Sequence, residues 1–194
     1  MGLSAEILAE FDACLEAARD AGEVEPTAMT VATRASSDGV SARTVLLKHH
    51  DERGFVFYTN LDSNKGRQLA AVPEAALVFH WKTIQRQVLV EGSVEQVTDD
   101  EADAYFASRP RGSQLGAWAS DQSQPLKSRA ELLKRVVAAE ARYFGRAVPR
   151  PPRWSGFRVL PRMVEFWNGK DSRLHDRFRY TLDAGAWKKQ RLNP

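Results

Sequence analysis

The sequence contains one cysteine and no apolar segment long enough to cross a bilayer. Cys14 cannot form an internal disulfide, and its spacing with Phe11 and Leu15 places it beside the apolar stripe of a helix, so we interpret it as a packing residue. The N-terminal stretch has acidic residues within its apolar periodicity and lacks a basic start, so it does not resemble a signal peptide. We therefore expect a cytoplasmic protein with no membrane partner.

Charge of one sign is not concentrated anywhere in the chain. The 28 basic residues face 25 acidic ones, and no run of lysine and arginine is interleaved with aromatic residues, so we expect no nucleic-acid partner. Glycine-rich nucleotide loops, a GxSxG elbow, an HExxH motif and paired cysteines are also lacking. The adjacent His49, His50 and Asp51 would point to alternate faces of a strand, so we predict no metal site.

The patterns that are present predict a mainly β protein with peripheral helices, of the α+β class. We expect a single domain over residues 1–194, with an N-terminal helix within 1–22 and a helical insertion over 99–145. About eight strands in hairpin order predict an antiparallel closed or split β-barrel, because an open sheet of that size tends to curl. Turn signals are expected at 36–39 and 51–54, and Gly92 marks a bulge or bend. The expected strands are 27–34, 41–48, 54–59, 76–82, 85–97, 156–167, 174–180 and 186–192, and the expected helices are 4–21, 63–71, 99–109, 113–119 and 128–144. Ser4 and Asp99 are the expected caps of the first and third of these helices.

Three cationic or near-cationic side chains alternate near the C-terminus. Arg173, His175 and Arg177 occupy every second position, so on an extended strand they would share one face. Such a face is either a solvated strand edge or a surface that meets an anion or an electron-rich ligand.

The segment RTVLLK, residues 43–48, places a cation at each end of an apolar strand. With a period of two, Arg43 falls on one face and Lys48 on the other, and both faces are substantially apolar. We therefore expect a strand covered on both sides, with its terminal cations near anions or water.

A second cationic group lies in the segment YFASRPRGSQ, residues 105–114. Tyr105 and Arg109 are four residues apart on one helix face, and Ser113 follows Pro110 at the expected start of the next helix. Free backbone N–H groups there favour negative charge, so the group is either a phosphate cradle or a capped helix hairpin with surface arginines.

Several segments together resemble the pyridoxine/pyridoxamine 5′-phosphate oxidases, FMN enzymes of the split-barrel family. The resemblance runs from about Ala28 to Pro194 and implies a homodimer of split barrels with FMN at the subunit interface. The segments are RTVLLK (43–48), FYTNLDSNKGRQ (57–68), RQVLVEG (86–92), YFASRPRGSQLGAWASDQS (105–123), FWNGKDSRLHDR (166–177) and the terminal RLNP.

The resemblance also implies site residues. Lys48, Tyr105, Arg109 and Ser113 match the family's clamp on the substrate phosphate, and Arg173 and His175 match the catalytic pair over the reacting carbon. The positions that match FMN contacts are Arg43, Thr44, Val45, Leu46, Lys48, Tyr58, Thr59, Asn64, Lys65, Gln87, Gln122, Ser123, Trp167 and Arg177.

The implied reaction is hydride transfer from C4′ of pyridoxine or pyridoxamine 5′-phosphate to flavin N5, followed by reoxidation by O2 to give H2O2. The amine substrate passes through an imine that water hydrolyses to ammonia and pyridoxal 5′-phosphate. Two alternatives stay open: a related FMN oxidase acting on another ring system, as in phenazine pathways, or a flavin or pyridoxal phosphate binding protein without turnover.

The sequence departs from the family pattern in two places. Asn64 stands where many members have arginine beside the flavin phosphate, which removes one charge and is expected to weaken FMN binding by about 1 to 3 kcal/mol. The chain also begins almost at its first helix, whereas longer members carry an N-terminal arm that helps to cover the substrate.

Overall fold

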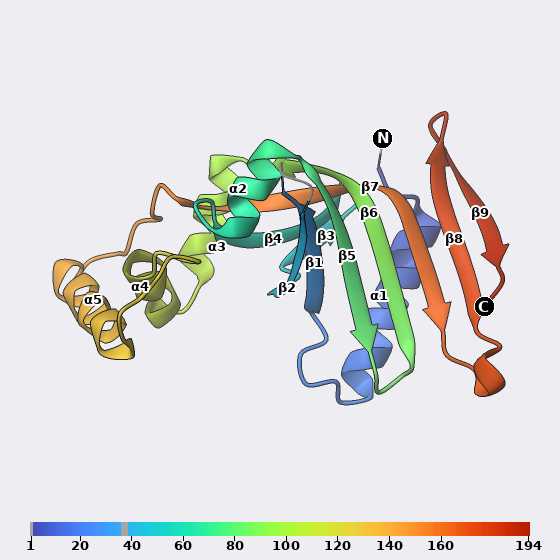
Figure 1. The fold of residues 1–194 in the computed structure, drawn as a ribbon, viewed down its shortest axis with the longest axis horizontal. Helices are drawn as coiled ribbons and strands as arrows, with labels where there is room; N and C mark the ends of the chain where they lie inside the picture. Colours follow the sequence, from blue (N-terminus) through green and yellow to red (C-terminus); the bar gives the residue numbers. More distant parts are fainter. Residues whose placement is uncertain (1, 36–38) are drawn as a thin grey trace.

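The computed structural model describes residues 2–35 and 39–194, and the described strands form one antiparallel nine-stranded sheet. The strand order is β2-β1-β5-β6-β7-β4-β3, with β8 paired to β7 and β9 to β8 (Figure 1). The strands are β1 (Ala28–Arg34), β2 (Val40–Leu46), β3 (His49–Asp51), β4 (Gly54–Asn60), β5 (Glu74–Trp81), β6 (Arg86–Gln96), β7 (Trp154–Asn168), β8 (Asp176–Asp183) and β9 (Ala186–Leu192). The expected mainly β, antiparallel fold with peripheral helices is confirmed.

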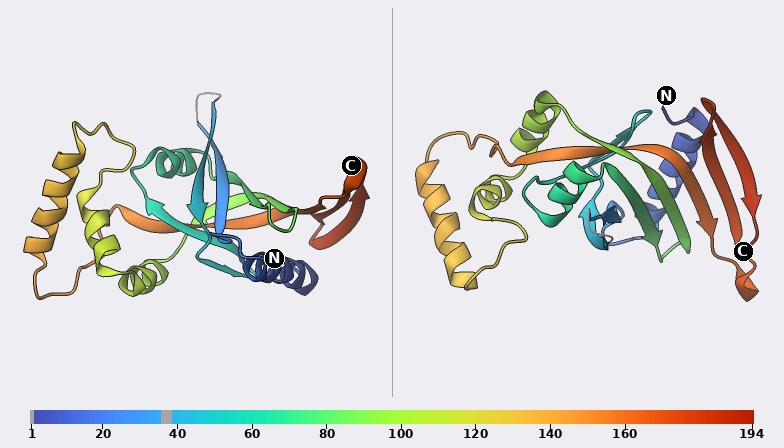
Figure 2. Two further views of the ribbon diagram at one scale, coloured as in Figure 1. Left: turned by 90° about the horizontal axis from the view of Figure 1, so that it is seen from below. Right: turned by 45° about the horizontal axis from the view of Figure 1, so that its top comes forward.

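The helices lie around a strongly curled sheet. Figure 2 shows α3, α4 and α5 grouped at one end of the molecule and β8 and β9 at the other, with the long strand β7 running between them. The helices are α1 (Ala5–Asp20), α2 (Asn64–Ala71), α3 (Asp99–Ser108), α4 (Arg111–Ala119) and α5 (Arg129–Arg142), followed by the short 3₁₀ helix η1 (Asp171–Arg173). None of the helices in the described part of the chain is long and apolar enough to cross a membrane.

Helix α1 packs on the sheet through the apolar stripe expected from its sequence. Ser4 caps it by accepting a hydrogen bond from the Ile7 N–H at 3.3 Å. Phe11 meets Phe55 edge-on, with ring centroids 4.9 Å apart, in the main core. Cys14 is buried and burial raises the pKa of its thiol, which agrees with a packing role.

Several boundaries differ from the sequence prediction. Strand β3 was not expected, because three residues carry too little periodicity and form a strand only by pairing with β4. Thr98, not Asp99, caps α3 through a capping box with Glu101. Helix α4 begins at Arg111, which places Ser113 in its first turn. The bulge at Gly92 is confirmed, whereas most of the turn predicted at 36–39 lies outside the described residues.

The expected strand through Arg173 and His175 is wrong. Ser172 and Arg173 have φ values of 55° and 61°, and β8 begins only at Asp176, so these residues form a turn. The chain needs left-handed residues to reverse direction between β7 and β8, and an alternating cation pattern carries no signal of that need. Arg177 alone of the three cations lies on the strand.

The expectation that the strand of residues 43–48 is covered on both faces is also wrong within one chain. Strand β2 ends at Leu46, and Val40, Ala42 and Thr44 on one face are exposed. Sequence alternation does not distinguish a face covered by its own chain from one left open.

Candidate functional site

Two adjoining cavities lie where β2, β4 and β7 meet the helical end of the molecule. Their volumes are about 250 and 360 Å³. They share five lining residues, which are Tyr58, Thr59, Arg109, Gln122 and Trp154. We call the smaller one, which Lys48, Lys65 and Tyr105 also line, the basic cavity, and the larger one, which Ser113 lines, the helix cavity.

Lys65 is a buried cation with no acidic partner among the described residues. It lies in the first turn of α2, which Ser63 caps, and only 7% of it is exposed. Its Nζ lies 3.1 Å from Thr59 Oγ1 and 3.0 Å from Gln122 Oε1, both uncharged. Burial lowers the pKa of Lys65, and the positive charge of Arg43 lowers it further. A buried ammonium without a counter-ion fits an anion that is bound from outside the chain.

Arg43 lies near Lys65 and is also bonded only to uncharged groups among the described residues. Its guanidinium donates to Thr33 Oγ1 at 2.5 Å and to Gln68 Oε1 at 3.1 Å. Burial lowers the pKa of Arg43. Two desolvated positive charges therefore lie close together at this end of the sheet, which fits the predicted site for the FMN phosphate.

An aromatic stack forms the wall between the two cavities. The Tyr58 ring centroid lies 4.1 Å from that of Tyr105 and 5.2 Å from that of Trp154, these two lie 6.1 Å from each other, and the three ring planes are nearly parallel. Gly156 makes this possible, because a Cβ there would lie 2.8 Å from the Tyr58 ring. Burial raises the pKa of both tyrosines, so their hydroxyls stay protonated donors at neutral pH.

Arg109 lies against this stack at the end of α3. Its guanidinium carbon is 4.8 Å from the Trp154 ring centroid, and Nη1 is buried without a hydrogen-bond partner among the described residues. Burial lowers the pKa of Arg109. The structure thus brings the predicted phosphate-clamp residues Lys48, Tyr105 and Arg109 to the basic cavity, while Ser113 faces the helix cavity beside Arg109.

Of the remaining predicted residues at this end, three line the basic cavity, whereas Asn64 and Ser123 line neither cavity. Thr44, Val45 and Leu46 line the basic cavity from β2. Ser123 accepts a hydrogen bond from the Asn64 N–H at 3.3 Å, which joins α2 to the loop after α4.

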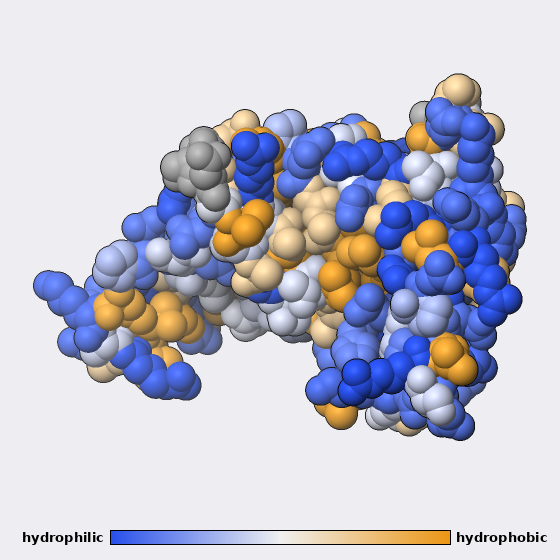
Figure 3. All heavy atoms as spheres, turned by 45° about the vertical axis from the view of Figure 1, so that its right-hand side comes forward, coloured by the Kyte–Doolittle hydropathy of each residue, from blue (hydrophilic) through white to orange (hydrophobic). Residues whose placement is uncertain are grey.

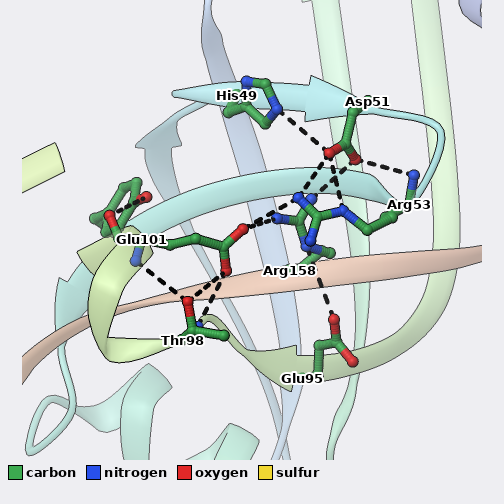
Figure 4. A network of polar contacts seen from close by, with 8 residues as sticks. His49, Asp51, Arg53, Glu95, Thr98, Glu101 and Arg158 are labelled. Carbon is green, nitrogen blue, oxygen red and sulfur yellow. Dashed lines mark hydrogen bonds and ion pairs between the residues drawn. The ribbon is translucent and has the colours of Figure 1, made fainter. Parts of the chain in front are cut away.

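A charge network holds α3 in place behind the cavities (Figure 4). Arg158 of β7 is 1% exposed, and its guanidinium donates to Asp51 Oδ1 at 2.9 Å and to Glu101 Oε1 at 2.7 Å. Although burial would raise their pKa values, hydrogen bonds and the charge of Arg158 keep the pKa of both carboxyls below its ordinary value. Tyr105 follows Glu101 by one helical turn, so this network fixes the position of the helix that carries the predicted clamp residue Tyr105. The sequence contained no local sign of it, since its members are more than 40 residues apart.

A second group of predicted residues lies at the other end of β7. Gln87, Trp167 and Arg177 are direct neighbours across β6, β7 and β8, and therefore share one face of the sheet. The Arg177 guanidinium forms an ion pair with Glu165, 2.8 Å away, so part of its charge is neutralised within the chain.

Arg173 and His175 complete this second group. His175 packs on Trp167, with ring centroids 4.6 Å apart, and its Nδ1 accepts a hydrogen bond from the Lys170 N–H at 3.1 Å. A neutral His175 therefore carries its proton on Nε2. Arg173 is exposed on the turn, and His175 borders a cavity of about 370 Å³ with the C-terminal residues.

The two groups do not meet within one chain. Trp154 and Trp167 mark the two ends of β7, and 13 residues at about 3.3 Å each give a path of about 40 Å between them. Figure 1 shows the helical end and η1 on opposite sides of the molecule. The expectation that Arg173 and His175 lie over a substrate held by Arg109 therefore requires more than one copy of the chain.

Comparison with known proteins identifies relatives of the whole chain. Residues 15–144 match the family model described as pyridoxamine 5′-phosphate oxidase, and residues 154–194 match the pyridoxine 5′-phosphate oxidase C-terminal dimerisation region. A pyridoxine/pyridoxamine 5′-phosphate oxidase from Myxococcus xanthus (strain DK1622) is 57% identical over 184 residues, which cover 95% of this chain and 89% of that protein.

Solved structures agree with this fold. PhzG from Burkholderia lata 383, in complex with tetrahydrophenazine-1-carboxylic acid, superposes with a TM-score of 0.92 at 32% identity, covering 96% of this chain and 92% of that one. An FMN binding protein from Nostoc punctiforme PCC 73102, related to pyridoxamine 5′-phosphate oxidase, has a TM-score of 0.81 at 15% identity, over the full length of both chains. The matches to both parts of the sequence show that the chain belongs to the pyridoxamine 5′-phosphate oxidase family.

Proposed function

We propose that the protein oxidises pyridoxine or pyridoxamine 5′-phosphate to pyridoxal 5′-phosphate, with FMN as cofactor and O2 as electron acceptor. The observation that carries this proposal is the presence of two cationic centres at one cavity, neither of which has an acidic partner among the described residues. Lys65 forms one centre, with Arg43 near it but outside the cavity lining, and Arg109 with Lys48 forms the other. A cavity that accepts two phosphorylated molecules side by side needs two such centres.

The residues at the first centre fit the FMN phosphate. Lys65 Nζ has uncharged partners only, so a bound phosphate would supply the counter-charge it lacks among the described residues. Thr59 and Gln122 hold the ammonium in place and add hydrogen-bonding groups at the same point. Bound FMN supplies the two-electron chemistry that accepts hydride from C4′ and passes electrons to O2.

The residues at the second centre orient the substrate. Arg109 and Lys48 bind its phosphate, which takes no part in hydride transfer, so their binding energy aligns the ring without entering the chemistry. Tyr105 adds a hydroxyl donor whose pKa is raised by burial. The stacked rings of Tyr58 and Trp154 exclude water from one wall.

We propose that a second copy of the chain completes the site. The C-terminal segment matches a dimerisation region, and a homodimer would bring the row of Gln87, Trp167 and Arg177 to the cavity of its partner, with FMN at the interface. Apolar side chains remain uncovered over the central part of the face in Figure 3, and Val40 of β2 is 82% exposed. Exposed apolar surface of this kind is typical of an interface.

In such a dimer, His175 and Arg173 would act on the ring of the substrate. The Lys170 N–H fixes the neutral tautomer of His175, so that Nε2–H is free to donate to a polar group of the pyridine. Arg173 offers a planar set of donors on the same turn. Both roles are binding and orientation, and no proton transfer is assigned to either residue.

A second candidate is oxidation of an unphosphorylated ring, as suggested by the likeness to PhzG. The 57% identity to a pyridoxine/pyridoxamine 5′-phosphate oxidase and the cationic pair Arg109 and Lys48 favour the phosphorylated substrate.

One anaerobic experiment distinguishes the candidates. The FMN-loaded protein is mixed with pyridoxine 5′-phosphate without oxygen, the flavin absorbance is followed, and air is then admitted. We expect bleaching, then recovery of the absorbance with one pyridoxal 5′-phosphate formed per flavin reduced. A flavin that stays oxidised with both the alcohol and the amine substrate would refute the proposed function.

A further inference from the structure

Trp154 contacts the clamp arginine through its ring face. The guanidinium carbon of Arg109 lies 4.8 Å from the Trp154 ring centroid and 5.5 Å from that of Phe106. Among the described residues, no carboxylate forms an ion pair with Arg109, and its Nη1 is buried without a partner. Aromatic faces are therefore the main contacts that hold this cation in place.

The Trp154 ring is itself rigidly held. It is 7% exposed, stacks on Tyr58 with an interplanar angle of 8°, and meets Phe106 edge-on at 5.0 Å. The Trp154 backbone is anchored as well, because its carbonyl accepts a hydrogen bond from Arg150 at 2.8 Å.

Arg150 also connects this anchor to the helix that carries Arg109. Its guanidinium donates to Asp99 at 2.7 Å and to Asp103 at 2.5 Å, both on α3. Arg150 therefore ties the Trp154 backbone to the helix that ends at Arg109.

A ring face suits this position better than a carboxylate would. A carboxylate partner would occupy two of the guanidinium's five N–H donors and neutralise its charge, whereas a stacked ring leaves the donors in their plane free for a phosphate. Trp154 lines both cavities, so the stacked guanidinium lies at the point where an anion can reach it.

We propose that Trp154 is a positioning residue for the substrate phosphate, acting through Arg109. This inference rests on the proposed function. It assigns to Trp154 a role in substrate affinity that is separate from FMN binding and from the hydride-transfer step.

A double-mutant cycle tests this role. We compare the native protein with Trp154→Leu, Arg109→Ala and the double variant, and measure FMN content, kcat and KM for pyridoxine 5′-phosphate. Trp154→Leu should raise KM about tenfold, because the loss of a desolvated cation–π contact weakens substrate binding by about 1 to 2 kcal/mol. The FMN content should stay unchanged. In the Arg109→Ala background the same change should have no further effect on KM.

Trp118 offers a matched control. It lies on α4, and Arg142 lies 5.2 Å from its ring, but it lines neither the basic nor the helix cavity. Trp118→Leu should leave KM within about twofold of the native value. Trp154→Phe, which keeps a smaller ring face, should give an intermediate KM and serves if the leucine variant does not fold.

Failure of the proposed function and failure of the role of Trp154 would give different results. If the native protein does not reduce its flavin, the proposed function fails, and calorimetric titration of the FMN-loaded variants with pyridoxal 5′-phosphate still tests the coupling of Trp154 to Arg109. If the native protein turns over but the effects of the two single variants multiply in the double variant, Trp154 does not act through Arg109 and the inference is overturned. An unchanged KM in both Trp154 variants would overturn it as well.

Discussion

Replacing Lys65 by methionine should affect FMN binding and stability in different ways. Methionine keeps the length of the buried stem and removes the ammonium. The loss of charge-assisted hydrogen bonds to a phosphate is worth about 1.5 to 3 kcal/mol, so the Kd for FMN should rise about 10- to 150-fold. The same substitution should not destabilise the FMN-free protein.

The expected change in the free energy of unfolding of the FMN-free protein follows from the groups around Lys65 Nζ. Its hydrogen bonds to Thr59 and Gln122 are to uncharged groups and contribute about 1 kcal/mol each. Burial of an ammonium without a counter-ion costs several kcal/mol even after relaxation. Removal of the charge therefore offsets the lost hydrogen bonds, and the free energy of unfolding in urea should stay equal or rise.

The stability difference between Lys65→Met and the native protein should depend on pH in one direction. Burial lowers the pKa of Lys65 below the ordinary 10.5, with the charge of Arg43 adding to the shift. In the folded FMN-free protein the cost of the buried charge is present in full below the lowered pKa, and it diminishes as the pH rises from there towards 10.5. The stability advantage of Lys65→Met should therefore shrink at alkaline pH.

Two measurements check this reasoning. Quenching of flavin fluorescence gives the Kd for FMN, and urea denaturation of the FMN-free protein gives its free energy of unfolding at a fixed protein concentration. Lys134→Met removes the same charge from an exposed position on α5 and should change neither quantity. A Lys65→Met protein that binds FMN normally but unfolds more than 2 kcal/mol more easily would refute an anion-binding role for this lysine.

Three further predictions concern the same region. Arg109→Ala should raise KM for the phosphorylated substrate much more than it lowers FMN content, and equal losses of both would show that the anion is wrongly assigned. Asn64→Arg should tighten FMN binding by about 1 kcal/mol in a fluorescence titration, because it adds a cation at the first turn of α2, and an unchanged Kd would contradict the cost expected of Asn64. Arg158→Met should lower the free energy of unfolding by about 3 to 5 kcal/mol, since two carboxylates lose their buried cation, and a loss below 1 kcal/mol would contradict that account.

Local sequence patterns predicted the features that depend only on neighbouring residues, such as helix faces, helix caps and strand bulges. The apolar stripe of α1, the cap at Ser4 and the bulge at Gly92 follow from side-chain periodicity and backbone preference, and all three are present. Where two neighbouring residues can both cap a helix, as at Thr98 and Asp99, local preference does not decide between them. The reciprocal bond to Glu101 selects Thr98.

The family resemblance supplied the list of site residues, but not their arrangement. Lys65, Tyr105 and Arg109 come together because α2 follows the end of β4 and packs on β1, while α3 packs on β7, the strand that pairs with β4. The sequence did not predict the contact between the Trp154 ring and Arg109, because Trp154 follows a proline-rich connector and has no regular spacing from Tyr105 or Arg109.

What the sequence by itself determined is most of the helices and strands, the family and the chemical types of the predicted site residues. Only the tertiary structure decided which of those groups meet. Arg173 and His175 follow the far end of a 15-residue strand from Arg109, where Ser172 and Arg173 adopt left-handed backbone conformations, so the two predicted groups of site residues do not meet within one chain. The reason is physical: a strand extends about 3.3 Å per residue, and pairing with β4 and β6 holds β7 extended.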